Sequence, residues 1–186
     1  MTHSAKPETA LRDGAAAPPR RIVLTGFMGS GKSTVGPLIA NRLGWNFLDV
    51  DEVIESEADI TIAEIFARYG EAEFRKREKE TVARLASGDR LVLALGGGAI
   101  EHAPTREMLI ASPGTLLVHL EVRLTTALAR CRGAEHTRPL LADQTNLEGR
   151  YQRRLPLYRS AHLSVMVDAL TPDEVVDAIL KAANLG

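Results

Sequence analysis

Short apolar runs, separated by longer segments of helical periodicity, recur along the whole chain. The run Leu91-Val92-Leu93-Ala94-Leu95 is the clearest, because a short, unbroken apolar segment is typical of a strand that is buried on both faces. Strands that alternate with helices imply a parallel sheet covered by helices on both faces, an α/β fold. We expect the strands at residues 21–25, 46–51, 91–95, 115–120 and 163–167.

The segments between these strands have apolar residues at helical spacing, or residues that are typical of helix ends. Gly44 should end the helix that follows the first strand. Thr171, Pro172 and Glu174 form a helix start: a capping hydroxyl, a first-turn proline and an acidic residue three positions after the cap. We expect helices at residues 32–43, two within 52–87 with the second at 73–85, then 104–111, 123–132, 146–161 and from 172 onward.

Length and composition limit the domain count and the class of partner. A chain of 186 residues with 45% apolar content favours one domain with a real core. We expect that domain at residues 21–186, and residues 1–20, which are rich in Ala, Pro and Thr and lack periodicity, as a disordered leader. The net charge of −1 favours neither nucleic acid nor an anionic membrane as a partner.

The cysteine content and the hydropathy pattern indicate the compartment. Cys131 is the only cysteine, so no disulfide can form within the chain. No apolar run approaches the roughly 20 residues of a membrane span, and the N-terminus lacks the apolar segment of a signal peptide. We therefore expect a cytoplasmic protein.

Residues 26–34, GFMGSGKST, fit the phosphate-loop spacing G-x-x-x-x-G-K-[ST]. An expected strand precedes this segment and an expected helix follows it, which is the context that the motif requires. Glycines let backbone amides turn toward phosphate oxygens, and the helix directs its positive end to the same place. Lys32 adds a cation for the β- and γ-phosphates, and the Ser33 hydroxyl suits Mg²⁺.

Two aspartates follow at the end of the expected second strand, at the sheet edge where α/β proteins bind ligands. Asp49 is a candidate magnesium partner. Asp51, which strand alternation would turn away from Asp49, could orient an acceptor hydroxyl and take its proton. The alternative for either aspartate is a helix N-cap, and Asp51 is well placed for that too.

Glycines and arginines supply further candidates. Gly96-Gly97-Gly98 directly follows the most apolar strand and marks either a tight turn or a close approach of backbone to a ligand. Arg75, Arg138 and Arg154 offer planar forks for carboxylate or phosphate, and the segment around Arg138 breaks the helical periodicity as a lid over a phosphoryl-transfer site would.

Six segments occur in one order over roughly residues 21–160: GFMGSGKSTVG, FLDVD, IAEIFARYGEAEFRKRE, LGGGA, RPLL and RLPLY. Together they resemble the shikimate kinase family. The resemblance implies phosphorylation of the 3-hydroxyl of shikimate by ATP, on the route to chorismate and aromatic amino acids. It also implies a monomer with one Mg²⁺ per subunit and a three-layer αβα P-loop kinase fold with a five-stranded parallel sheet. A substrate-binding region at about 51–87 and a lid at about 132–143 complete the expected domain.

The resemblance also transfers residue roles by motif. The expected nucleotide contacts are Gly29, Ser30, Gly31, Lys32, Ser33, Thr34 and, from the lid, Arg138. The expected magnesium residues are Ser33 and Asp49. The expected shikimate contacts are Asp51 for the hydroxyls, Arg75 and Arg154 for the carboxylate, and Gly98. The expected catalytic residues are Asp51, Lys32 and Arg138.

Two other functions remain open on the residues alone. A gluconate kinase of the same fold would have no need for the pair Arg75 and Arg154. A catalytically silent nucleotide-binding module would be expected to lack Lys32, Asp51 or Arg138, yet all three are present. ADP formation with shikimate, with gluconate or with neither acceptor separates the three hypotheses.

Overall fold

The computed structural model describes residues 18–131 and 144–185 and contains one parallel sheet of five strands. The strand order is β2-β3-β1-β4-β5, so the first strand, β1, lies in the centre of the sheet. The central strands are buried along their length, as expected where helices cover both faces. The strands are β1 (Arg21–Thr25), β2 (Asn46–Asp49), β3 (Leu91–Ala94), β4 (Thr115–Glu121) and β5 (Leu163–Met166).

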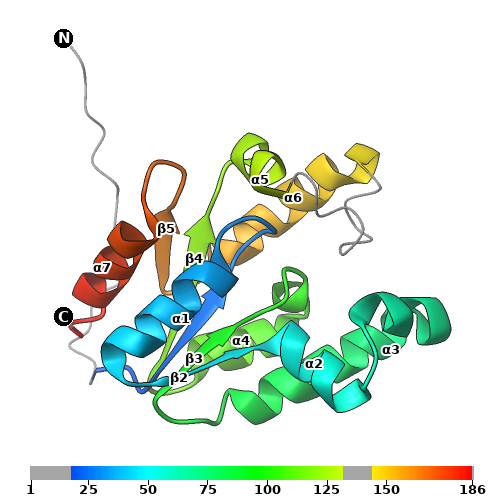
Figure 1. The fold of residues 1–186 in the computed structure, drawn as a ribbon, viewed down its shortest axis with the longest axis horizontal. Helices are drawn as coiled ribbons and strands as arrows, with labels where there is room; N and C mark the ends of the chain where they lie inside the picture. The colour runs from blue at the N-terminus through cyan, green and yellow to red at the C-terminus, as the bar shows by residue number, and fades with distance from the viewer. Residues whose placement is uncertain (1–17, 132–143, 186) are drawn as a thin grey trace.

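Helices cover the sheet as in a three-layer αβα fold (Figure 1). Helices α1 and α7 pack against each other on one face, and α4 lies on the opposite face. The pair α2 and α3 projects beyond the β2 edge (Figure 1). The helices are α1 (Lys32–Leu43), α2 (Val50–Ala58), α3 (Ile62–Leu85), α4 (Ala103–Ala111), α5 (Leu124–Cys131), α6 (Gln144–Tyr158) and α7 (Pro172–Ala182), with a 3₁₀ turn, η1 (Ala99–Glu101), before α4.

The carboxyl ends of β1, β2 and β3 lie together because the strands are parallel and in register. Val23 and Leu24 of β1 pair with Leu93 and Ala94 of β3. Asp49 at the end of β2 also pairs with Ala94. The segments that follow these strands therefore share one edge of the sheet, where ligands bind in open α/β folds.

The second strand ends earlier than the sequence predicted. Asp49 is its last residue, and the Asp49 side chain accepts a hydrogen bond from the backbone N–H of Asp51 at 3.0 Å. Asp49 is thus the N-cap of α2, and Asp51 lies in the first turn of that helix. The expectation of a strand through residue 51 was wrong, and strand alternation does not set the relation of the two side chains.

Helix α3 also begins earlier than expected, at Ile62 rather than Glu73. Thr61 and Glu64 form a capping box at its start, which the sequence analysis overlooked. At Gly70 the backbone leaves helical geometry, with φ of 79° and ψ of 171°, before the helix resumes. The charged helix expected at 73–85 is therefore the second part of a longer, interrupted element.

The predicted signals at other helix ends are confirmed. Thr171 and Glu174 form a capping box at the start of α7, and α1 ends at Gly44 with φ of 63°. Residues 132–143, where we expected the lid, and residues 1–17 of the expected leader lie outside the described part of the chain. Among the helices that the structure describes, none combines the length and the apolar character required to cross a membrane.

Candidate active site

The loop between β1 and α1 has the geometry of a phosphate cradle. Gly29 and Gly31 have φ values of 72° and 94°, which favour glycine and bend the loop around its centre. Gly31 is the N-cap of α1 and provides no side-chain cap, so no capping side chain competes for the first-turn amides. A Cβ at Gly31 would meet no heavy atom within 4 Å, which leaves space for an anion at the positive end of the helix.

Lys32 turns its ammonium group toward this loop. Its Nζ donates to the carbonyl oxygens of Gly26 at 2.9 Å and Phe27 at 3.2 Å, and lies 3.5 Å from Oγ of Ser30. The Ser30 side chain is buried, whereas Thr34 is exposed at the start of α1. The ammonium group of Lys32 is therefore held against the phosphate loop by the backbone of that loop.

Asp49 connects the phosphate loop to the start of α2. Its Oδ2 accepts a hydrogen bond from Oγ of Ser33 at 2.9 Å, while its Oδ1 caps the Asp51 amide. The capping role that we had weighed as an alternative is thus real for Asp49, and it fixes the carboxylate beside Ser33. A hydroxyl and a carboxylate at this distance form a pair of hard oxygen donors, which fits Mg²⁺ bound mainly by phosphate and water.

Asp51 is the buried carboxylate of the site. Its Oδ1 has no hydrogen-bond partner among the described residues. Burial raises the pKa of Asp51 to about 6, and the negative charges of Asp49 and Glu78 add to the rise, while Lys32 opposes it. A carboxylate with a raised pKa and an unpaired oxygen is suited to accept a proton near neutral pH.

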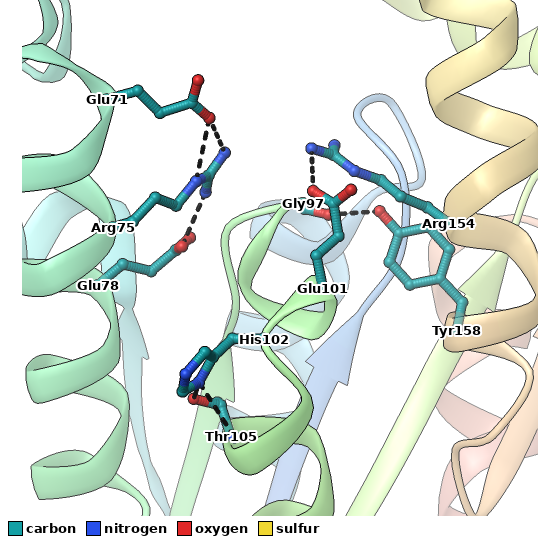
Figure 2. A network of polar contacts seen from close by, with 9 residues as sticks. All are labelled: Glu71, Arg75, Glu78, Gly97, Glu101, His102, Thr105, Arg154 and Tyr158. Carbon is teal, nitrogen blue, oxygen red and sulfur yellow. Dashed lines mark hydrogen bonds and ion pairs between the residues drawn. The ribbon is translucent and has the colours of Figure 1, made fainter.

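Arg75 reaches the site from the second part of α3 (Figure 2). Its Nη1 donates to Oε2 of the buried Glu78 at 2.8 Å, and its Nη2 donates to Glu71 at 3.1 Å. The guanidinium group lies against the glycine loop after β3: a Cβ at Gly98 would be only 2.5 Å from Nη1. Gly98 therefore gives the arginine room beside the loop.

Arg154 approaches the same loop from α6, on the side opposite to Arg75 (Figure 2). It is buried, with 4% of its surface exposed, and its Nη2 donates to Oε2 of Glu101 at 2.7 Å. A Cβ at Gly97 would lie 3.8 Å from Arg154 Nη1. The two arginines thus flank neighbouring residues of one loop, which is the arrangement required to hold a small acid between them.

Tyr158, one turn after Arg154, fixes the glycine loop. Its hydroxyl donates to the carbonyl oxygen of Gly97 at 2.5 Å. Its ring stacks on His119, with centroids 5.1 Å apart. Burial raises the pKa of Tyr158, and burial lowers the pKa of His119 to about 4. Both groups are therefore neutral near pH 7 and act as a support for the loop.

The structure brings together most of the predicted site residues. The loop residues with Lys32, Ser33, Asp49 and Asp51 lie at the carboxyl ends of β1 and β2, and Arg75, Gly98 and Arg154 gather at the loop after β3. Arg138 lies outside the described residues.

Three contributors escaped the sequence analysis: Glu78, Glu101 and Tyr158. Glu78 and Tyr158 stand three and four residues after an arginine on a helix, a spacing that places side chains on one face and could have revealed them. Glu101 is 53 residues from Arg154, and no local signal announces their contact.

Comparison with known proteins gives a consistent result. A family model described as shikimate kinase matches residues 28–184. The chain is 42% identical to a shikimate kinase of Moorella thermoacetica over 166 residues, which cover 88% of this chain and 94% of the relative. It is 44% identical to a shikimate kinase of Ruegeria pomeroyi over 173 residues, 91% of this chain and 87% of the relative.

A solved structure of a shikimate kinase has a similar fold. The shikimate kinase from Acinetobacter baumannii in complex with shikimate has a TM-score of 0.80 to this fold at 38% identity. The match covers 88% of this chain and 92% of that one. The similarity therefore extends over nearly the whole described chain rather than over the phosphate loop alone.

Proposed function

Because the chain belongs to the shikimate kinase family, we propose that it transfers the γ-phosphoryl group of ATP to the 3-hydroxyl of shikimate. The products are shikimate 3-phosphate and ADP, within the route to chorismate and aromatic amino acids. The observation that carries the proposal is one arrangement of side chains. Asp51, a buried carboxylate with an unpaired oxygen, lies within electrostatic reach of Lys32, while Arg75 and Arg154 flank the neighbouring glycine loop.

The phosphate loop holds the nucleotide. Backbone amides from Gly29 to Thr34 surround the phosphates at the N-terminus of α1, and Lys32 compensates the charge that develops on the β- and γ-phosphates. Because phosphoryl transfer depends mainly on position and charge, this cradle supplies a large part of the catalysis.

Asp51 and the two arginines place the acceptor. The arginines bind the carboxylate of shikimate, one from each side of the glycine loop, and so direct the ring hydroxyls toward Asp51. Asp51 accepts the proton of the 3-hydroxyl as that oxygen bonds to the γ-phosphorus and ADP leaves. We also propose that Arg138, which lies outside the described residues, binds the phosphates of the nucleotide from the lid.

We include one Mg²⁺ per subunit, held by Ser33 and Asp49. The fit rests on their hydrogen bond of 2.9 Å, which puts two hard oxygen donors beside the phosphate loop. When bound, the ion neutralises phosphate charge during transfer. We further propose a cytoplasmic monomer that has no nucleic-acid or membrane partner.

A coupled assay of ADP formation tests this function. The full chain is mixed with ATP and Mg²⁺ and with shikimate, gluconate or quinate in separate reactions. ADP release with shikimate alone is the expected result. ADP release with gluconate would support the gluconate kinase hypothesis, and no release with any acceptor would support a catalytically silent nucleotide-binding module.

A further inference from the structure

The ion pair between Arg154 and Glu101 joins a buried side chain to a partly exposed one. The Arg154 side chain is 5% exposed and the Glu101 side chain is 39% exposed. Arg154 projects from α6, whereas Glu101 ends the 3₁₀ turn η1 that follows the glycine loop (Figure 2). Rotation of its side chain can bring Glu101 into solvent, but Arg154 remains buried, and a buried guanidinium group without an anionic partner is destabilised.

Glu101 uses only part of the binding capacity of the guanidinium group. The bond runs from Nη2 to one carboxylate oxygen, and Nε of Arg154 has no partner among the residues that the structure describes. Carboxylates bind arginine most strongly through two parallel N–H···O bonds. A second carboxylate that engages two donors would therefore replace Glu101 without leaving the arginine unpaired.

The other arginine differs in this respect. Arg75 is paired with Glu78, whose side chain is only 4% exposed and cannot withdraw into solvent. Its second partner, Glu71, is 62% exposed. Arg75 thus keeps a buried carboxylate in direct contact. The carboxylate in direct contact with Arg154 can leave, and the buried Glu78 acts on Arg154 through its charge alone.

We propose that Glu101 competes with the substrate for Arg154: it occupies the guanidinium group in place of the substrate's carboxylate and is displaced when the acid binds. This inference rests on the proposed function. An acid exchanges one carboxylate for another and keeps the buried charge paired, while a neutral polyol leaves the ion pair intact and gains nothing from Arg154. Glu101 therefore competes with an acidic ligand for Arg154 and lowers the affinity for that ligand, while it keeps the buried guanidinium group paired when no acid is bound.

The test compares Glu101→Gln with Glu107→Gln, which removes the same charge from an exposed position on α4. Shikimate KM and kcat are measured at saturating ATP, and shikimate binding is measured by calorimetry without nucleotide. We expect Glu101→Gln to lower KM and Kd about two- to fivefold, the upper part of the range for a partly exposed ion pair, with kcat unchanged. Glu107→Gln should leave KM, Kd and kcat at the wild-type values.

Two further measurements distinguish displacement of Glu101 by the substrate's carboxylate from a general change in the affinity of the site. For the methyl ester of shikimate, which carries no carboxylate, Glu101→Gln should leave Kd unchanged. In an Arg154→Lys background the gain from Glu101→Gln should shrink, because the two residues act through one contact. An equal gain in affinity for the ester, or an undiminished gain in that background, would overturn the proposal.

An unchanged or raised Kd for shikimate in Glu101→Gln would also overturn it, since a raised value means that Glu101 only positions Arg154. Calorimetry does not require turnover, so it decides on Glu101 separately from the ADP assay. Absence of ADP with wild-type protein and shikimate counts against the proposed function, whereas normal turnover with an unchanged Kd counts against the role of Glu101 alone.

Discussion

The unpaired Oδ1 of Asp51 and the unpaired Oε1 of Glu78 converge on Gly96. A Cβ at that glycine would lie 2.8 Å from the first oxygen and 2.7 Å from the second. Neither oxygen has a hydrogen-bond partner within the described residues. Burial raises the pKa of Glu78, an effect that Arg75 opposes. For Asp51, burial and the neighbouring negative charges raise the pKa and only the positive charge of Lys32 lowers it, so Asp51 is the group expected to titrate near neutral pH.

The first prediction concerns the pH dependence of catalysis. Asp51 must be deprotonated to accept a proton, and its pKa is raised to about 6. We expect kcat/KM to fall as pH decreases through about 6 and to level off above pH 7. Initial rates between pH 5 and 8, in buffers of constant ionic strength, measure the profile. A flat profile from pH 5 to 7 would contradict a base with this pKa.

The second prediction is that Asp51→Asn abolishes most turnover while nucleotide binding persists. An amide has nearly the same shape but cannot accept the proton, so kcat should fall by about 10² to 10⁴. ATP binding by calorimetry and kcat by the coupled assay separate the two effects. Glu52→Gln, at the exposed neighbouring position of α2, is the control and should retain activity. Normal turnover in Asp51→Asn would remove Asp51 as the base.

The same substitution should stabilise the fold. Because folding raises the pKa of Asp51, the contribution of this group to stability is greatest below the unfolded pKa of 3.8 and is lost as pH rises through about 6. Asp51→Asn removes this loss, so its free energy of unfolding at pH 7 should exceed that of wild type by about 3 kcal/mol.

Urea unfolding at pH 7 and pH 4 measures this gain in stability. The difference between Asp51→Asn and wild type should shrink toward pH 4, where the wild-type carboxyl group is protonated. A mutant that is less stable than wild type at pH 7 would indicate that the Asp51 carboxylate is favourably solvated in the fold.

The fourth prediction is that Arg75→Ala raises the shikimate KM while the KM for ATP is unchanged. Loss of one charged hydrogen-bond donor to a carboxylate corresponds to about 10- to 100-fold in affinity. Arg77→Ala is the matched control, because Arg77 lies on the same helix and pairs with Glu73 at 2.9 Å. If both variants have the wild-type KM for shikimate, the carboxylate is held elsewhere.

The fifth prediction tests the space beside the glycine loop. Gly98 has φ of −97°, so alanine is compatible with its backbone, but the new Cβ would lie 2.5 Å from Nη1 of Arg75. We expect Gly98→Ala to displace the guanidinium group and raise the shikimate KM about tenfold, as a misplaced contact does. Gly149→Ala, whose Cβ would meet only the end of the Arg153 side chain at 3.4 Å, should be neutral. A wild-type KM in Gly98→Ala would show that Arg75 tolerates the shift.

The sequence alone determined the features that depend on local spacing. The phosphate loop, its flanking strand and helix, and the capping box at Thr171 are each encoded within a few consecutive residues. The unbroken apolar run at 91–95 likewise identified β3, an inner strand of the sheet, because burial on both faces leaves no polar position. The boundary at Asp49 was missed, although the capping role of an aspartate had been considered, because strand and cap patterns overlap there.

Only the tertiary structure decided which charges meet. Asp51 and Glu78 come from different helices and meet at Gly96, and their burial depends on the packing of α2 and α3 beside β3. Glu101 and Arg154 are far apart in the chain and come together because η1 and α6 lie side by side. Local patterns encode backbone geometry, whereas pKa values and ion pairs depend on distance and desolvation, which exist only once the chain has folded.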